Sequence, residues 1–193
     1  MAVEIVTVCV WGSVSIGSMT ARDSGRSRLY EAERLVHRMF DRVGSARTVQ
    51  IAGTELTLPA EALFSSVESV RSYVERVLAM NSVRQRFPRA SEPVTVRARG
   101  GYRAAEYRRA IGEIAIPDSR EGRWALRELV ILHEVAHHLD KGTGPAHGRG
   151  FVVTLTDLVG AVLGPEAAFV YRVVLTDSGV GAGRRNDSPG RIP

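Results

Sequence analysis

Apolar residues recur every three or four positions over several stretches of the chain, and this spacing predicts amphipathic helices. The first runs from about residue 27 to 43 and ends at Gly44, and the second runs from about residue 60 or 66 to Met80. Two more cover about residues 147–163 and 166–175, separated by a Gly-Pro break. The pattern predicts a chain whose C-terminal half is helical.

Shorter apolar stretches predict β-strands. Thr48–Ile51 and Glu55–Leu58 flank a turn and predict a hairpin. Val94–Ala98 and Gly112–Ile116 predict two further strands, with irregular arginine-rich chain between them. We therefore expect an α+β fold in which a short antiparallel or mixed sheet packs on a buried helix.

That buried helix is expected between the last strand and the C-terminal helices. Ser119 or a neighbour would cap it, and it carries apolar residues on most of its faces up to Leu139. The sequence KGTGP at residues 141–145 ends it. A helix with so little polar surface is expected at the centre of the core.

Both ends of the chain lack these patterns. Residues 1–18 are apolar with Glu4 as the only charged side chain, whereas a secretory signal would begin with positive charge. We predict a poorly anchored N-terminal extension over residues 1–21, a single domain over residues 22–176, and a disordered tail over residues 177–193.

Composition narrows the class of protein. The sequence contains no run of about 18 consecutive apolar residues, which is the length that predicts a membrane-spanning helix. The single cysteine, Cys9, excludes an intrachain disulfide, so the cytoplasm is the expected location. The formal net charge is +5, but 25 of the 26 basic residues are scattered arginines. Phosphate-binding surfaces normally use both lysine and arginine, so a nucleic-acid partner is not favoured.

The buried helix contains the sequence His133-Glu134-Val135-Ala136-His137. Residues four apart share one face of a helix, so the two imidazoles can bind one ion. Zinc binds neutral imidazole nitrogen, and a catalytic zinc site keeps one position for water. Glu134 can take a proton from that water, as metal-assisted hydrolysis requires. The motif predicts one catalytic zinc ion with Glu134 as general base.

Such a site needs a third protein ligand. His147 follows His137 by ten residues across a Gly- and Pro-rich turn, and a hairpin of that length can bring it back to the first pair. Asp157 and Glu166 are alternatives, while Asp140 is too near in sequence for an easy tetrahedron. A helix-cap role for His147 also stays open.

Other residues are weaker candidates. The reaction needs a group that stabilises transition-state charge, and Tyr171, Tyr107 or Tyr102 could supply a phenol. Aromatic residues at helical spacing are, however, usually part of the core. His138 lies about 100° around the helix from His137 and is expected to pack or to support a ligand.

The segments HEVAHHLD and HGRGF resemble zincin-type metallohydrolases, in which His-Glu-x-x-His is followed by His-Gly-x-x-Phe or Trp. SprT-like metalloproteases share this plan. The chain is most similar to a little-characterised group of bacterial and phage metallohydrolases that also begin like RDSGRSRLYEAERLV, and the likeness spans about Arg22 to Leu175. It implies a zincin-like fold, with His133, His137 and His147 as ligands and Glu134 as catalytic base.

The chain also departs from these relatives. It lacks the Cys-rich zinc ribbon of SprT-like proteases, so their DNA-dependent activity is not implied. It also lacks the glycine and third histidine that follow soon after the second ligand in metzincins. In zincin-like folds the strand at the place of Gly112–Ile116 borders the cleft, and an extended peptide can pair with its edge. An ordinary strand covering the helix is an equal alternative.

Three functional hypotheses follow. The favoured one is a zinc-dependent metallopeptidase acting on a polypeptide substrate. The second keeps the zinc ion as a structural element of a binding or regulatory module without catalysis. The third is a nucleic-acid-associated SprT-like protease.

Overall fold

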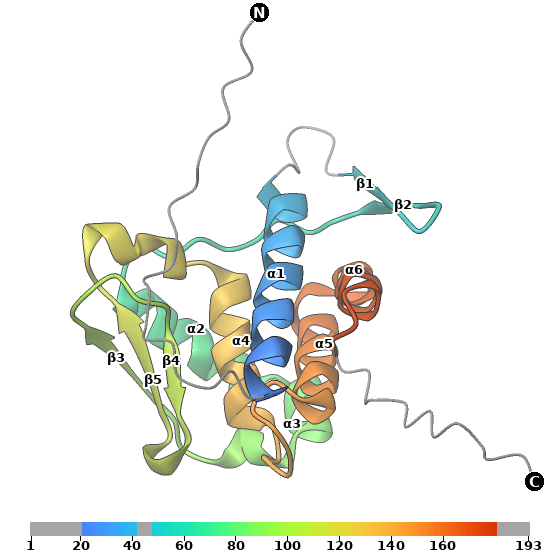
Figure 1. Cartoon of the computed structure of the whole chain (residues 1–193). Coiled ribbons are helices and arrows are strands. Elements are labelled where there is room, and N and C mark those ends of the chain that lie inside the picture. The colour runs from blue at the N-terminus through green and yellow to red at the C-terminus, as the bar shows by residue number, and fades with distance from the viewer. Residues whose placement is uncertain (1–20, 42–47, 181–193) are drawn as a thin grey trace, which may run out of the picture.

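The computed structural model describes residues 21–41 and 48–180 (Figure 1). The fold is α+β, as the sequence predicts. Short 3-10 helices are labelled η. In chain order the elements are α1 (Ala21–Asp41), β1 (Thr48–Ile51), β2 (Thr54–Thr57), α2 (Val67–Ala79), α3 (Asn81–Arg86), η1 (Pro88–Ser91), β3 (Thr95–Arg99), β4 (Glu106–Arg108), η2 (Arg109–Ile111), β5 (Glu113–Pro117), η3 (Arg120–Ala125), α4 (Glu128–Leu139), α5 (Arg149–Leu163) and α6 (Pro165–Asp177).

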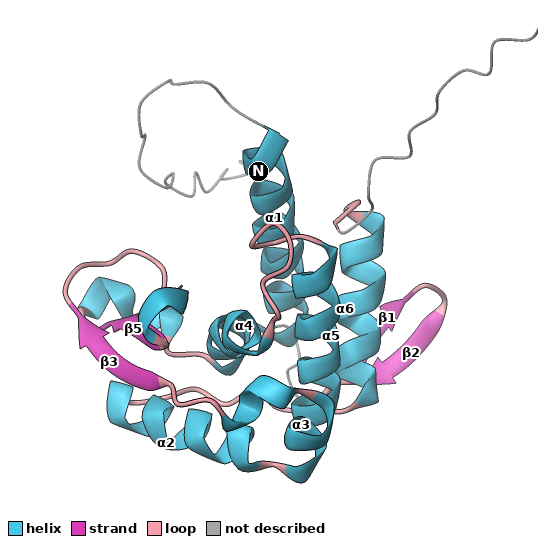
Figure 2. Cartoon of the chain, turned by 90° about the horizontal axis from the view of Figure 1, so that it is seen from below, coloured by secondary structure: helices cyan, strands magenta, loops and turns pink. Residues whose placement is uncertain are grey.

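The strands form two separate sheets. β1 and β2 make the predicted antiparallel hairpin. β5 is the middle strand of a three-stranded mixed sheet, parallel to β3 and antiparallel to β4. In the views of Figures 1 and 2 this sheet lies on one side of α4, while α1, α5 and α6 lie on the other.

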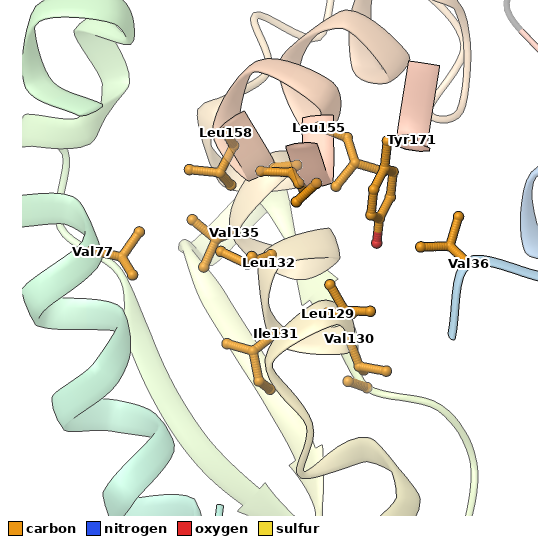
Figure 3. Close-up of a cluster of buried hydrophobic side chains, with 14 of the residues drawn as sticks. Val36, Val77, Leu129, Val130, Ile131, Leu132, Val135, Leu155, Leu158 and Tyr171 are labelled. Carbon is orange, nitrogen blue, oxygen red and sulfur yellow. The ribbon is translucent and has the colours of Figure 1, made fainter. Parts of the chain in front are cut away.

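The centre of the core is α4, as predicted from its apolar faces. Leu129, Ile131 and Leu132 are fully buried, and so is Val135 one turn later. Figure 3 shows side chains from α1, α2, α5 and α6 around this helix. The His-Glu-x-x-His sequence therefore lies in a helix whose side chains are largely buried.

The first helix, α1, covers one flank of α4 with an apolar stripe. Leu29, Ala32 and Val36 are fully buried and Phe40 nearly so, at the spacing that the sequence predicts for an amphipathic helix. The same buried face also carries Glu33, a charged residue that is only 5% exposed.

The N-terminus of α4 differs from the prediction. Ser119 caps η3, where its hydroxyl accepts a hydrogen bond from the Gly122 N–H at 3.0 Å. The chain leaves helical geometry at Leu126 and α4 begins only at Glu128. A distant carboxylate, that of Glu61, accepts the Leu129 N–H at 3.0 Å. The predicted cap residue, Ser119, therefore begins the short helix η3, and the predicted buried helix begins later, at Glu128.

The arginine-rich segment before β5 also differs from the prediction of irregular chain. It contains β4 and η2, which are only three residues each. Gly112 then turns the chain into β5 with a left-handed φ of 59°, and a Cβ there would lie 2.9 Å from the Pro93 carbonyl oxygen. A three-residue strand is too short to show alternation, so the pattern could not reveal it.

The last described residues close helix α6. Asp177 is the last residue of α6, and the Val180 N–H donates to the Leu175 carbonyl at 2.9 Å around a left-handed Gly179. Val180 and Leu175 are both buried, which completes a Schellman-type end. The remaining expectations for the two ends fall on residues 1–20 and 181–193, which lie outside the described residues.

In the part of the chain that the structure describes, every helix is too short or too polar to traverse a lipid bilayer.

Candidate metal centre

The three histidines that the sequence singles out converge at one point. The Nε2 atom of His137 lies 3.1 Å from Nε2 of His133 and 3.1 Å from Nε2 of His147. All three ligand atoms lie within 4.8 Å of one another. The four-residue spacing on α4 and the ten-residue connection to His147 therefore bring the three imidazoles together, as the sequence predicts.

The donor set fits a tetrahedral metal ion. Zn–N bonds of 2.0–2.1 Å in a tetrahedron place nitrogens about 3.3 Å apart, close to the two separations that involve His137, while the separation of His133 and His147 is within 4.8 Å. One shared proton could link His137 to either neighbour, but it could not serve both contacts at once. A cation at the centre satisfies all three nitrogens, so the arrangement suits an ion better than a hydrogen-bonded histidine cluster.

Two elements position these side chains. His133 and His137 are one turn apart on α4, while His147 lies in the turn just before α5. That turn is closed by the Gly148 N–H, which donates to the Pro145 carbonyl at 2.8 Å. Because α5 begins only at Arg149, His147 is outside helical geometry and can face back toward α4.

Phe151 supports the three imidazoles. It is almost fully buried on α5, and its ring stacks on His137 with centroids 4.2 Å apart. It also meets the rings of His147 and His133 edge-on, at 5.2 and 5.0 Å. The Phe of the HGRGF segment therefore packs directly against the three histidines and limits their rotamers.

The other ring nitrogen of His133 has a dedicated partner. Its Nδ1 lies 2.7 Å from Oε1 of Glu33, and both side chains are buried. Burial acts to lower the pKa of His133, but the charge and hydrogen bond of Glu33 outweigh it and hold the pKa above its ordinary value. Glu33 therefore contacts the nitrogen that does not face the other histidines.

The other two histidines are held neutral. Burial, followed by the charge of His133, lowers the pKa of His137 to about 2 and that of His147 to about 4. A neutral imidazole has a free lone pair at neutral pH, which is the form that binds zinc.

Glu134, the predicted base, is buried beside the ligands on α4. Burial raises its pKa above the ordinary value, although the charge of His133 and a hydrogen bond from the main chain of Tyr107 act in the opposite direction. A carboxyl group in this environment holds its proton more tightly than an exposed one.

A tyrosine that the sequence did not single out borders the centre. The ring of Tyr30, on α1, stacks on His133 at 5.8 Å and meets His147 at 5.5 Å. The guanidinium of Arg26 lies over the Tyr30 ring, 5.3 Å from its centroid. Burial raises the pKa of Tyr30, so its phenol is a hydrogen-bond donor at neutral pH.

The three tyrosines proposed from sequence lie elsewhere. Tyr171 is fully buried in the core. Tyr107 places its hydroxyl 3.1 Å from Nδ1 of His138, which is buried and packs against it as predicted. Tyr102 is 69% exposed. None of them has a ring contact with the three ligands, whereas Tyr30 has two.

The alternative ligands have other partners. The carboxylate of Asp140 accepts the Gly142 N–H at 2.9 Å, and that of Asp157 pairs with Arg86 at 2.6 Å. Glu166 is exposed in the first turn of α6. The cluster of ligand atoms found among the described residues consists of the three histidines.

The prediction that the strand Gly112–Ile116 offers a free edge to an extended peptide is wrong. Gly112–Ile116 corresponds to β5, which has β3 on one side and β4 on the other, so no edge of β5 is free to pair with a peptide. Within the described residues β4 is an edge strand of this sheet, and the main chain of its Tyr107 reaches Glu134. Of these two strands, β4 and not β5 is therefore at an edge of the sheet.

Glu33 and Tyr30 were missed because they are 100 or more residues away from the motif. For Glu33 a signal exists. It follows Leu29 by four residues and precedes Val36 by three, so it lies on the apolar stripe of α1. A carboxylate on the buried face of a helix needs a buried partner. The sequence alone does not say which partner that is.

Comparisons with known proteins do not identify a family. The resemblance to zincin-type metallohydrolases therefore stays a prediction from the sequence, and the functional argument rests on the geometry of the centre. Neither a family model, nor a curated protein, nor a solved structure matches the chain.

Proposed function

We propose that the protein is a zinc-dependent hydrolase, and specifically a metallopeptidase. The observation that carries the proposal is the convergence of three imidazole Nε2 atoms on α4 and the turn before α5, beside a buried glutamate. His133, His137 and His147 would hold the ion, and Glu134 would be the general base. A bound zinc ion would supply Lewis acidity, which acidifies water and polarises a carbonyl group.

The number of ligands favours catalysis over a structural role. Structural zinc sites are closed by four protein ligands, whereas catalytic sites have three and leave one position open. The described cluster has three. This supports the enzyme over the alternative of a structural zinc ion in a regulatory module.

Glu134 would move the proton. It would take a proton from the water that attacks the scissile carbonyl carbon, and it would then give this proton to the leaving amine nitrogen as the C–N bond breaks. Its burial and raised pKa support this role. Tyr30 is the candidate for donating a hydrogen bond to the developing oxyanion, since its ring, unlike those of the three tyrosines named from the sequence, contacts two of the proposed ligands.

The choice of a polypeptide substrate rests on β4. An extended peptide can add a strand to an exposed sheet edge. Among the described residues β4 has one neighbouring strand, and its Tyr107 main chain contacts Glu134, so a peptide added at this edge would lie near the proposed base. A nucleic-acid role has less support, because arginines of the sheet such as Arg97 and Arg108 pair with Glu113.

The test is the variant Glu134→Gln. Zinc content, measured by mass spectrometry of metals, should stay near one ion per chain in wild type and variant, because Glu134 is not a ligand. Cleavage of a peptide library derived from a proteome, read by peptide mass spectrometry, should fall about 10²–10⁴-fold. The control Glu166→Gln changes an exposed carboxylate and should cleave like wild type.

Equal cleavage by wild type and Glu134→Gln would refute the catalytic role. Zinc binding by a wild-type chain that cleaves no peptide would favour the structural-zinc alternative.

A further inference from the structure

Glu33 is a buried charge that the proposed reaction does not use. It lies on α1, is 5% exposed, and its Oε1 is 2.7 Å from Nδ1 of His133, which is 100 residues further along the chain. Ionised carboxylates are almost never buried without a partner, because losing their hydration costs several kcal/mol. The position therefore needs a reason other than packing.

Packing alone would be better served by an apolar residue. α1 already docks on the core through Leu29, Ala32 and Val36, which are fully buried. Replacing a buried ion pair by well-packed apolar side chains is often neutral or stabilising. The carboxylate on this stripe is therefore poorly explained as a device for docking α1.

Glu33 is also not a fourth ligand. The two nitrogens of an imidazole ring point away from each other, and Glu33 contacts Nδ1. The nitrogen of His133 that faces His137 is Nε2. A carboxylate on the Nδ1 side can act on the ion only through the ring.

We propose that Glu33 is a positioning residue of the metal centre. It accepts the Nδ1–H of His133, which fixes the tautomer with a free Nε2 lone pair and fixes the orientation of the ring. Its negative charge also makes that Nε2 a stronger electron-pair donor to a bound cation. The proposal rests on the proposed metal site, and it makes α1 a working part of that site instead of a cover for it.

Zinc affinity of the full chain tests this role. Competition with a chromophoric chelator should show zinc binding about 10–100-fold weaker in Glu33→Ala, the usual loss when the partner of a ligand histidine is removed. Glu33→Gln keeps an oxygen that can accept the Nδ1–H, so it should recover part of the affinity. The matched control is Glu31→Gln, an exposed carboxylate on the same helix that pairs with Arg34 at 3.9 Å, and it should bind like wild type.

A spectroscopic signature separates positioning from general support of the fold. In the zinc-loaded wild type, nitrogen NMR of labelled histidine should show His133 protonated at Nδ1 with a strongly hydrogen-bonded proton. That proton signal should weaken or move in Glu33→Ala while the signals of His138, whose Nδ1 lies 3.1 Å from the Tyr107 hydroxyl oxygen, stay in place. If Glu33→Ala does not fold, Glu33→Gln decides, with an expected loss of about threefold or more against Glu31→Gln.

Two results overturn the proposal. Zinc affinity in folded Glu33→Ala within twofold of wild type, with an unchanged His133 signal, would refute the role of Glu33 and leave the metal site standing. A wild-type chain that binds no zinc would refute both proposals. Peptide cleavage does not enter the measurement, so failure of the peptidase assignment has a separate readout.

Discussion

Tyr171 and Tyr73 are both buried phenols, but their hydroxyl groups have different surroundings. Tyr73 donates a hydrogen bond to the Glu128 carboxylate at 2.6 Å. Tyr171 has no hydrogen-bond partner among the described residues, and in Figure 3 its oxygen points toward the space between Val36 and Leu129. A buried polar atom without a partner loses its hydration and gains nothing in return.

The variant Tyr171→Phe should therefore stabilise the protein or leave it unchanged, by about 0–2 kcal/mol in the free energy of unfolding. Urea denaturation followed by circular dichroism measures this. Because Tyr171 lies in the core and not at the metal centre, its zinc affinity should equal that of wild type.

Tyr73→Phe is the matched control for that substitution. It removes the same hydroxyl group but leaves a buried carboxylate without one of its hydrogen bonds, so it should destabilise by about 1–3 kcal/mol. If Tyr171→Phe were as destabilising as Tyr73→Phe, the hydroxyl group of Tyr171 would have a hydrogen-bond partner in solution, contrary to the structure.

Among the elements of the fold, the three-stranded sheet and α4 are joined through η2 and Gly112. The Gly112 carbonyl accepts the Thr95 N–H at 2.8 Å and so sets the start of the β3–β5 pairing. In η2, Arg109 donates hydrogen bonds to the main-chain carbonyls of His137 and Asp140, both at 2.9 Å. These are carbonyls at the end of α4 that no helical N–H satisfies, so η2 holds the end of the helix that carries His137.

Gly112→Ala should disturb this junction. The residue has a left-handed φ of 59°, and an added Cβ would lie 2.9 Å from the Pro93 carbonyl oxygen. Left-handed backbone costs a residue with a Cβ about 1–2 kcal/mol, and the close contact adds to this cost. We expect a loss of about 2–3 kcal/mol in the free energy of unfolding, measured by urea denaturation.

The control for Gly112→Ala lies in the same sheet region. Gly100 has no positive φ and no atom within 4 Å of an added Cβ, so Gly100→Ala should change stability by less than about 0.5–1 kcal/mol. Equal effects of the two substitutions would contradict the conformational role given to Gly112.

At the scale of the whole molecule, the metal centre draws on elements from both halves of the chain. α4 supplies His133 and His137, the turn before α5 supplies His147, and α1 supplies Glu33. The three histidines and Glu33 come together where α1, α4 and the start of α5 meet, which requires the folded state. Metal binding at the proposed site would therefore stabilise the fold as a whole.

Zinc should raise the free energy of unfolding by about 4 kcal/mol at a free concentration 1,000 times its dissociation constant. Denaturation of the zinc-loaded and chelator-treated chain measures the gain. His147→Ala removes one ligand and should lose most of it. The control His37→Ala changes a histidine of α1 that is not in the cluster. Zinc should stabilise this variant by the same amount as wild type, even if the two differ in stability without zinc.

An equal gain from zinc in His147→Ala and His37→Ala would show that the ion binds elsewhere.

Much of this protein follows from its sequence alone, because the signals are local. The period of apolar residues predicts the helices, and alternation and turn residues predict the hairpin. Four-residue spacing places His133 and His137 on one helical face whatever surrounds that helix. A loop of ten residues is short enough for His147 to return to the same place.

Only the tertiary structure decided the rest, because those interactions join residues that are distant in sequence. The approach of Glu33 to His133 depends on how α1 packs across α4, and no local pattern encodes that packing. The start of α4 depends on Glu61 rather than on its nearest cap residue. A strand of three residues becomes visible only when it pairs, which is why β4, and not β5, was found at the edge of the sheet beside Glu134.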